Sequence, residues 1–179
     1  MTVRHVSLLR AINVGGRNLI SMARLRALYQ ALGCEDVATY LQSGNVVFWR
    51  EHDPADVGTH VERAIQRELG LEIHVLGRTQ AELARIVAAD PFPTADPSRR
   101  FVMFLSAAPN EAISREFGHV TSGPDEAVLM GQEFHLHCPD GIGNSKLTGL
   151  VSERRLGVTA TTRNWRTVTN LLELSSARS

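Results

Sequence analysis

The strongest indication of the fold is the stretch Thr39-Tyr40-Leu41-Gln42-Ser43-Gly44-Asn45-Val46-Val47-Phe48. Two short runs of β-favouring residues flank a Gly-Asn turn, which is the pattern of a β-hairpin. A second polar run, Leu9-Arg10-Ala11-Ile12-Asn13-Val14-Gly15-Gly16-Arg17-Asn18, follows a strand-like segment over residues 3–10. Between these runs, Ser21 precedes a helical pattern that stops at Gly33. The sequence therefore predicts a strand, a helix and a hairpin, in that order.

The pattern continues with a helix over residues 54–70 and an alternating strand over 71–75. Thr79 and Glu82 then have the spacing of a capping box at the start of an added helix. Residues 1–88 are thus predicted to form a ferredoxin-like β-α-β-β-α-β unit followed by one further helix.

Residues 89–100 contain three prolines and are predicted to form a linker. Residues 101–179 show the same order of patterns, although the two halves share no evident sequence identity. The expected elements are strands at 101–105, 128–130, 134–138 and 158–161, and helices at 110–117, around 147–151 and from Asn164. The predicted fold class is α+β, with two tandem ferredoxin-like units and an added helix after each.

The topology of such units brings polar segments together. The first two strands run in the same direction, so Asn13 to Arg17 is expected beside Gln42 to Asn45. The same reasoning places Asn144 to Lys146 near Thr162 to Asn164 in the second half. If the two halves pack with these ends facing, one cleft collects charged residues from both. The candidate ligand-binding residues are Arg10, Asn13, Gly15, Gly16, Arg17, Ser43, Gly44, Asn45, Lys146, Arg163 and Asn164.

These residue types suit an anion. Gly15 and Gly16 permit positive φ and close approach to the main chain, N–H groups in such turns cradle anions, and arginine matches carboxylate or phosphate. Each residue also has a simpler interpretation: the glycines form ordinary turns, Asn164 caps the last helix, and Lys146 is a solvated lysine. Neither a P-loop nor a dinucleotide-binding glycine motif is present.

Charge and cysteine content narrow the class of protein. The 179 residues contain 19 Lys and Arg against 19 Asp and Glu, which disfavours extended nucleic-acid binding because that function usually needs a basic excess. Cys34 and Cys138 lack metal or disulfide spacing and are expected to be reduced and buried. No signal peptide or membrane span is evident. We therefore expect a cytoplasmic protein, monomeric or homodimeric, with no cofactor and no membrane partner.

One further cluster has metal-binding residue types. Glu133, His135 and His137 share one face of a predicted strand, so a site with two histidines and a carboxylate is conceivable. An exposed polar face is the expected alternative. No catalytic triad or carboxylate pair can be assigned from the remaining residues.

The two polar runs, together with Lys146-Leu147 and Thr162-Arg163-Asn164-Trp165, resemble the bacterial family known as domain of unknown function 1697. The resemblance is strongest over residues 8–48 and 141–174. It implies a duplicated α+β arrangement and a shared site at the candidate residues, but no established activity. This chain has Ala11 where the family typically has glycine, so we expect no positive φ at that position.

The leading hypothesis is a protein that binds a small anionic ligand, such as a nucleotide or a phosphorylated metabolite. An RNA- or single-strand-binding module is one alternative, with Phe48 and Trp49 as stacking aromatics. An enzyme acting on the same anionic ligand is another. In a fourth interpretation, the polar motifs only hold the fold together.

Overall fold

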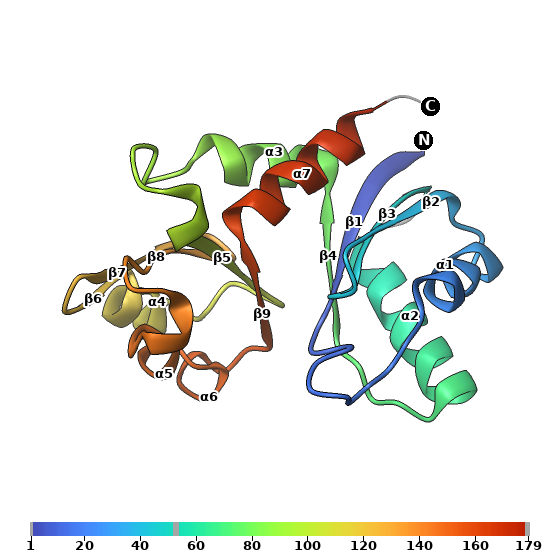
Figure 1. Ribbon diagram of the computed structural model, residues 1–179, viewed down its shortest axis with the longest axis horizontal. Coiled ribbons are helices and arrows are strands. Elements are labelled where there is room, and N and C mark those ends of the chain that lie inside the picture. The colour runs from blue at the N-terminus through green and yellow to red at the C-terminus, as the bar shows by residue number, and fades with distance from the viewer. Residues whose placement is uncertain (1, 52–53, 178–179) are drawn as a thin grey trace. The chain divides into compact units, whose positions relative to one another are not determined.

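In the computed structural model, which describes residues 2–51 and 54–177, the chain forms two antiparallel sheets and several helices (Figure 1). The α+β class predicted from the sequence is confirmed. Two compact units are present: unit 1 comprises Met1–Arg85 and Asn170–Ser179, and unit 2 comprises Ile86–Thr169. This division lies near the sequence-based boundaries at residues 88 and 101, but it assigns the end of the last helix to unit 1. No helix in the described part of the chain is long and apolar enough to cross a membrane.

Unit 1 contains a four-stranded sheet, sheet 1, with the strand order β2-β3-β1-β4 and antiparallel pairing throughout. This order and these directions are the ones that a ferredoxin-like unit requires. The elements are β1 (Val3–Leu9), α1 (Met22–Ala31), β2 (Glu35–Tyr40), β3 (Asn45–Arg50), α2 (Pro54–Leu69), β4 (Val75–Thr79) and α3 (Gln80–Ala88).

Helices α1 and α2 lie on one face of sheet 1 (Figure 1). Their apolar stripes bury the core with residues of β1 and β3, and Phe48 packs against Tyr29 with ring centroids 5.0 Å apart. The ends of α1 follow the predicted signals: the Ser21 side chain accepts a hydrogen bond from the Arg24 N–H, and Gly33 follows the helix at φ 78°.

The opposite face of sheet 1 is associated with α3 and with the end of α7 (Trp165–Ser176). The Asn170 side chain donates to the Tyr40 hydroxyl at 2.7 Å, and Gln80 donates to the Ser176 hydroxyl at 3.2 Å. The predicted capping box also forms, since the Thr79 N–H donates to the Glu82 carboxylate at 2.8 Å.

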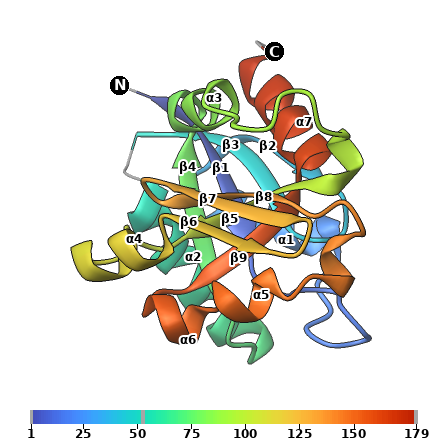
Figure 2. The ribbon, with the colours of Figure 1, turned by 90° about the vertical axis from the view of Figure 1, so that its left-hand side faces the viewer.

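Unit 2 contains a five-stranded sheet, sheet 2, with the order β6-β7-β8-β5-β9 (Figure 2). One face carries a core that includes Met103, Phe134 and Leu136 of the sheet and Phe117, Leu147 and Leu156 of the helices. The elements are the 3-10 helix η1 (Pro97–Arg99), β5 (Arg100–Leu105), α4 (Glu111–Phe117), β6 (His119–Ser122), β7 (Asp125–Met130), β8 (Glu133–His137), the 3-10 helix η2 (Ile142–Asn144), α5 (Leu147–Leu150), α6 (Glu153–Leu156) and β9 (Ala160–Asn164).

Three details differ from the prediction. The edge strand β6 was not expected, because its four residues include a single apolar side chain, Val120, and give no alternating pattern. The second helix of unit 2 is two short helices, α5 and α6. Strand β4 begins at Val75 rather than at residue 71, since Leu71 and Ile73 pack into the core without joining the ladder.

Candidate functional site

The two polar motifs of unit 1 lie side by side at one end of sheet 1, which we call the loop end. It consists of the tip loop, residues 10–20, and the hairpin loop, residues 41–44. The Leu9 N–H donates to the Gly44 carbonyl at 2.8 Å, and the Asn13 amide donates to the Gln42 carbonyl at 2.8 Å. The adjacency expected from the strand directions is therefore present.

The tip loop is a tight hairpin turn. Val14 and Arg17 form an antiparallel bridge, and the Arg17 N–H donates to the Val14 carbonyl at 3.0 Å. Gly15 and Gly16 between them have φ of 56° and 73°, as a two-residue turn with positive φ at both positions requires. The glycines thus have the turn role that the simpler interpretation gave them.

The expectation for Ala11 was wrong, because its φ is 55°. A non-glycine residue in this region is strained, and neighbouring contacts hold it there. The Asn18 side chain donates to the Ala11 carbonyl at 3.0 Å. Positive φ at this position is therefore compatible with alanine in this chain.

The asparagines of the loop end bind backbone rather than point outward. The Asn13 side chain accepts from the Ile20 N–H at 2.8 Å and donates to the Ile20 carbonyl at 2.9 Å, in addition to its bond with Gln42. The buried Asn45 side chain donates to the Tyr40 carbonyl and to the Ser43 hydroxyl. Asn13 and Asn45 therefore fix the shape of the two loops.

Gly44 has a steric role as well as a conformational one. A Cβ at this position would lie 2.7 Å from Ile12 Cδ1 and 2.8 Å from the Cβ of Leu9, and the φ of Gly44 is 81°. No side chain fits in this geometry. The close approach of the hairpin loop to the end of β1 depends on this glycine.

The groups that remain available at the loop end are charged and apolar. Arg17 is exposed, and its guanidinium forms no hydrogen bond or ion pair within the described residues, whereas Arg10 is half-buried. Val14, Leu19 and Leu41 are 62%, 68% and 54% exposed. Exposed apolar side chains therefore accompany the exposed guanidinium on these two loops.

The three candidate residues of unit 2 occupy different environments. Lys146 is exposed at the start of α5. Arg163 lies opposite Val102 in the ladder and so points to the face of sheet 2 away from the α4–α6 core. Asn164 accepts from the Arg166 N–H at 3.0 Å, the capping role that was its simpler interpretation, and it donates to the Ser98 carbonyl. The expected proximity of Lys146 to Arg163 stays a prediction.

Glu133 and His135 on β8 lie on this same face of sheet 2, and the expectation that they form an exposed polar face was wrong. Glu133 and His135 are buried rather than exposed, at 8% and 2% exposure. Burial lowers the pKa of the His135 imidazole, with Asp90 opposing this effect, and burial lowers the pKa of Arg163 to about 10. The Arg163 guanidinium donates to the Thr161 hydroxyl at 2.8 Å.

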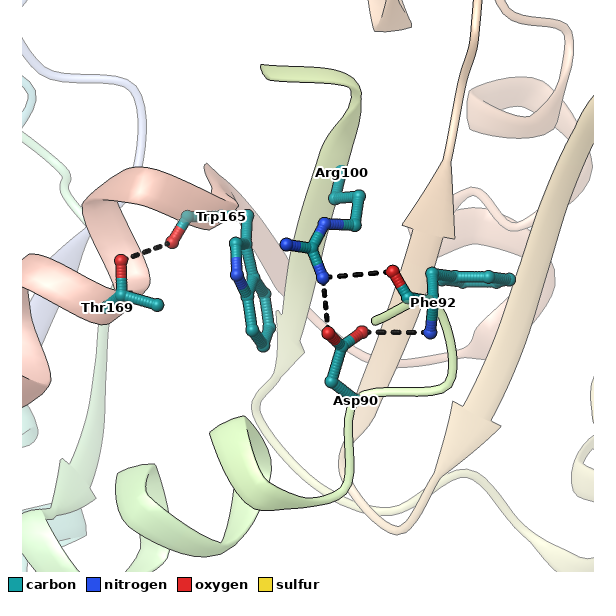
Figure 3. A network of polar contacts seen from close by, with 5 residues as sticks. All are labelled: Asp90, Phe92, Arg100, Trp165 and Thr169. Carbon is teal, nitrogen blue, oxygen red and sulfur yellow. Dashed lines mark hydrogen bonds and ion pairs between the residues drawn. The ribbon is translucent and has the colours of Figure 1, made fainter. Parts of the chain in front are cut away.

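A polar network that the sequence did not indicate joins the proline-rich segment to the rest of unit 2 (Figure 3). The Arg100 guanidinium lies between the Asp90 carboxylate and the Trp165 indole, 4.7 Å from the ring centroid, and donates to the Phe92 carbonyl at 3.0 Å. Trp165 is buried. Asp90, Phe92 and Arg100 are within eleven residues, but Trp165 is far from them in sequence, so no local motif marks the network.

The pattern of a family described as "Protein of unknown function (DUF1697)" matches residues 1–135. The chain belongs to this family. The match includes both loops of the loop end and stops before Lys146, Arg163 and Asn164. No curated protein matches the chain significantly in sequence.

The family assignment agrees with a solved structure described as that of "conserved bacterial protein SP0830 from Streptococcus pneumoniae". The two chains superpose with a TM-score of 0.78 at 20% sequence identity, over 98% of this chain and 100% of the other. This similarity extends the shared fold to the C-terminal part of the chain.

Proposed function

We propose that this protein binds a small anionic ligand, such as a nucleotide or a phosphorylated metabolite, at the loop end of sheet 1. The observation that carries the proposal is the group of donors on the tip loop. The Arg17 guanidinium and the N–H groups of Gly15 and Gly16 have no acceptor within the described part of the chain. A guanidinium beside exposed N–H groups suits phosphate or carboxylate oxygens.

Two further features support a ligand-binding role for the tip loop rather than a purely structural one. The hydrogen bonds of Asn13 and Asn45 hold the loops in place before binding, so little conformational entropy is lost when a ligand is bound. Leu19 and Leu41 offer apolar contact area beside the arginine, which suits the base of a nucleotide. The contribution of Lys146 and Arg163 from unit 2 stays a prediction.

The test is a thermal-shift screen of nucleotides, sugar phosphates and coenzymes against the wild type and an Arg17→Ala variant. A ligand at about 100 times its Kd adds about 2.7 kcal/mol to stability, which raises the Tm of a chain of this size by about 5–11 °C. We expect the shift to disappear in Arg17→Ala. Arg63→Ala is the matched control, because Arg63 is also exposed and has no partner within the described residues.

A protein partner is the second candidate, favoured by the exposure of Val14, Leu19 and Leu41. A ligand shift that survives Arg17→Ala but not Leu19→Ser would favour apolar recognition over anion binding. Phe48 was one of the two aromatic residues that supported the nucleic-acid alternative. It is fully buried in the core of unit 1 and cannot stack on a base, which weakens that alternative.

A further inference from the structure

The end of sheet 1 opposite the loop end, which we call the cavity end, contains two cavities that share Thr2 and Trp49 in their walls. One has a volume of about 350 Å³ and is lined mainly by residues of β1, α3 and the end of α7. The other, of about 340 Å³, is lined by Leu32, Glu35, Trp49 and Arg50 among others. Both lie within unit 1, and neither includes a residue of the two polar motifs.

The cavity of about 340 Å³ has opposite charges in its wall that do not neutralise each other. Glu35 and Arg50 both line it, yet they form no ion pair within the described part of the chain. The Arg50 side chain is half-buried: one terminal nitrogen is enclosed by protein and out of reach of a ligand, and the guanidinium also interacts with the Cys34 thiol, so only the remaining part of the guanidinium faces the cavity. Glu51 adds a second carboxylate to the wall.

The aromatic side of the cavity is held by contacts of its own. Trp49 lies opposite Arg4 and Glu35 in the ladder, and the Arg4 guanidinium lies 5.2 Å from the centroid of its ring. Arg4 is buried and pairs with the Asp36 carboxylate, next to a β-bulge between Glu35 and Ala38. The indole is therefore held in place by Arg4, and Leu32 is a second apolar residue in the cavity wall.

We propose that this cavity binds a small zwitterion of the amino-acid class. Arg50 receives the ligand carboxylate, Glu35 receives the ammonium group, and Trp49 with Leu32 contacts the side chain. A simple anion would meet the carboxylates of Glu35 and Glu51, and a simple cation would meet Arg50. A ligand with both charges is complementary to the cavity wall, because its carboxylate lies against Arg50 and its ammonium group against Glu35.

The first experiment titrates the full chain with each of the twenty free amino acids, using calorimetry and intrinsic fluorescence, since Trp49 is in the cavity wall. We expect saturable binding of at least one amino acid with an apolar side chain. The N-acetyl and amide derivatives of that amino acid, each lacking one charge, are expected to bind about tenfold or more weaker. Absence of binding across the panel, or equal binding of a derivative, would overturn the proposal.

Two variants then assign the charges. Glu35→Gln is expected to weaken binding of the free amino acid about tenfold and to leave the affinity for its N-acetylated form nearly unchanged, because that form has no ammonium group. Arg50→Gln is expected to show the converse pattern with the amide derivative. Glu72→Gln and Arg63→Gln are matched controls on exposed residues of the same unit. Affinity that is lost equally for every ligand form would contradict the assignment, and Arg17→Ala separates this site from the loop end because it should have no effect here.

Discussion

The two ends of sheet 1 use polar residues in different ways. At the loop end, the side chains of Asn13 and Asn45 bind the backbone of the two loops, and Arg17 is exposed. At the cavity end, Glu35 and Arg50 line a cavity without pairing with each other. The Gly/Asn motifs of the loop end therefore serve mainly to fix the backbone. The charged residues of the cavity end are not part of any recognisable sequence motif.

The largest expected effect at the loop end is that of Gly44→Ala. The new Cβ would lie 2.7 Å from Ile12 Cδ1 at a φ of 81°, so we expect a loss of about 3 kcal/mol in the free energy of unfolding. Urea unfolding followed by fluorescence measures it. Gly16→Ala has a similar φ but no atom within 4 Å, so its cost should be about 1 kcal/mol. Equal losses for the two variants would show that close packing is not what Gly44 provides.

At the cavity end, Asp36→Asn tests whether a charge pair contributes to stability there. The Arg4 side chain is 7% exposed and Asp36 is 41% exposed, so the change leaves a buried guanidinium without this counter-charge. We expect a loss of about 2 kcal/mol, less than for a fully buried pair. Glu111→Gln, which breaks an exposed pair with Arg115, should change stability by less than about 0.5 kcal/mol. If both variants behave alike, the pair with Arg4 is no stronger than a surface pair.

Asn13→Ala sharpens the comparison at the loop end. It removes three hydrogen bonds to Ile20 and Gln42, but water can reach the freed groups, so we expect a loss of about 1.5 kcal/mol. Asn18→Ala removes the hydrogen bond from the Asn18 side chain to the Ala11 carbonyl and should cost less. Hydrogen exchange of the tip loop gives a second measurement, with faster exchange expected in Asn13→Ala.

The smallest effect on stability is expected for Arg17→Ala. Its guanidinium has no partner within the described residues, so the free energy of unfolding should change by less than about 0.5 kcal/mol. A larger loss, measured by the same urea unfolding, would mean that Arg17 supports the loop and would remove the main support for an anion site.

Much of the fold could be predicted because its signals are local. The Ser21 cap, the Thr79 and Glu82 capping box and the hairpin at Gly44 each depend on residues a few positions apart. Strand β6 could not be predicted because an exposed edge strand needs few apolar residues. The tandem ferredoxin-like interpretation stays a prediction: the strand order of sheet 1 agrees with it, whereas sheet 2 has the additional edge strand β6.

The candidate site was less predictable, because burial depends on the whole fold. The alternation of Glu133 and His135 was recognised, yet the sequence does not say whether that face is covered, and both are buried. Ala11 has positive φ because Asn18, seven residues away, holds its carbonyl. The cavity end combines Leu32, Glu35 and Arg50 from separate segments, and no spacing rule identifies such a set.

Helix α7 has a consequence for biosynthesis. Its last residues belong to unit 1, where Asn170 and Ser176 bond to Tyr40 and Gln80. During translation, domains generally fold as they emerge, the N-terminal one first. Unit 1 departs from this order, because its final contacts become available only after unit 2 has been synthesised. Unit 1 therefore has a complete sheet early in synthesis, but it lacks the contacts of Asn170 and Ser176 until α7 has been made.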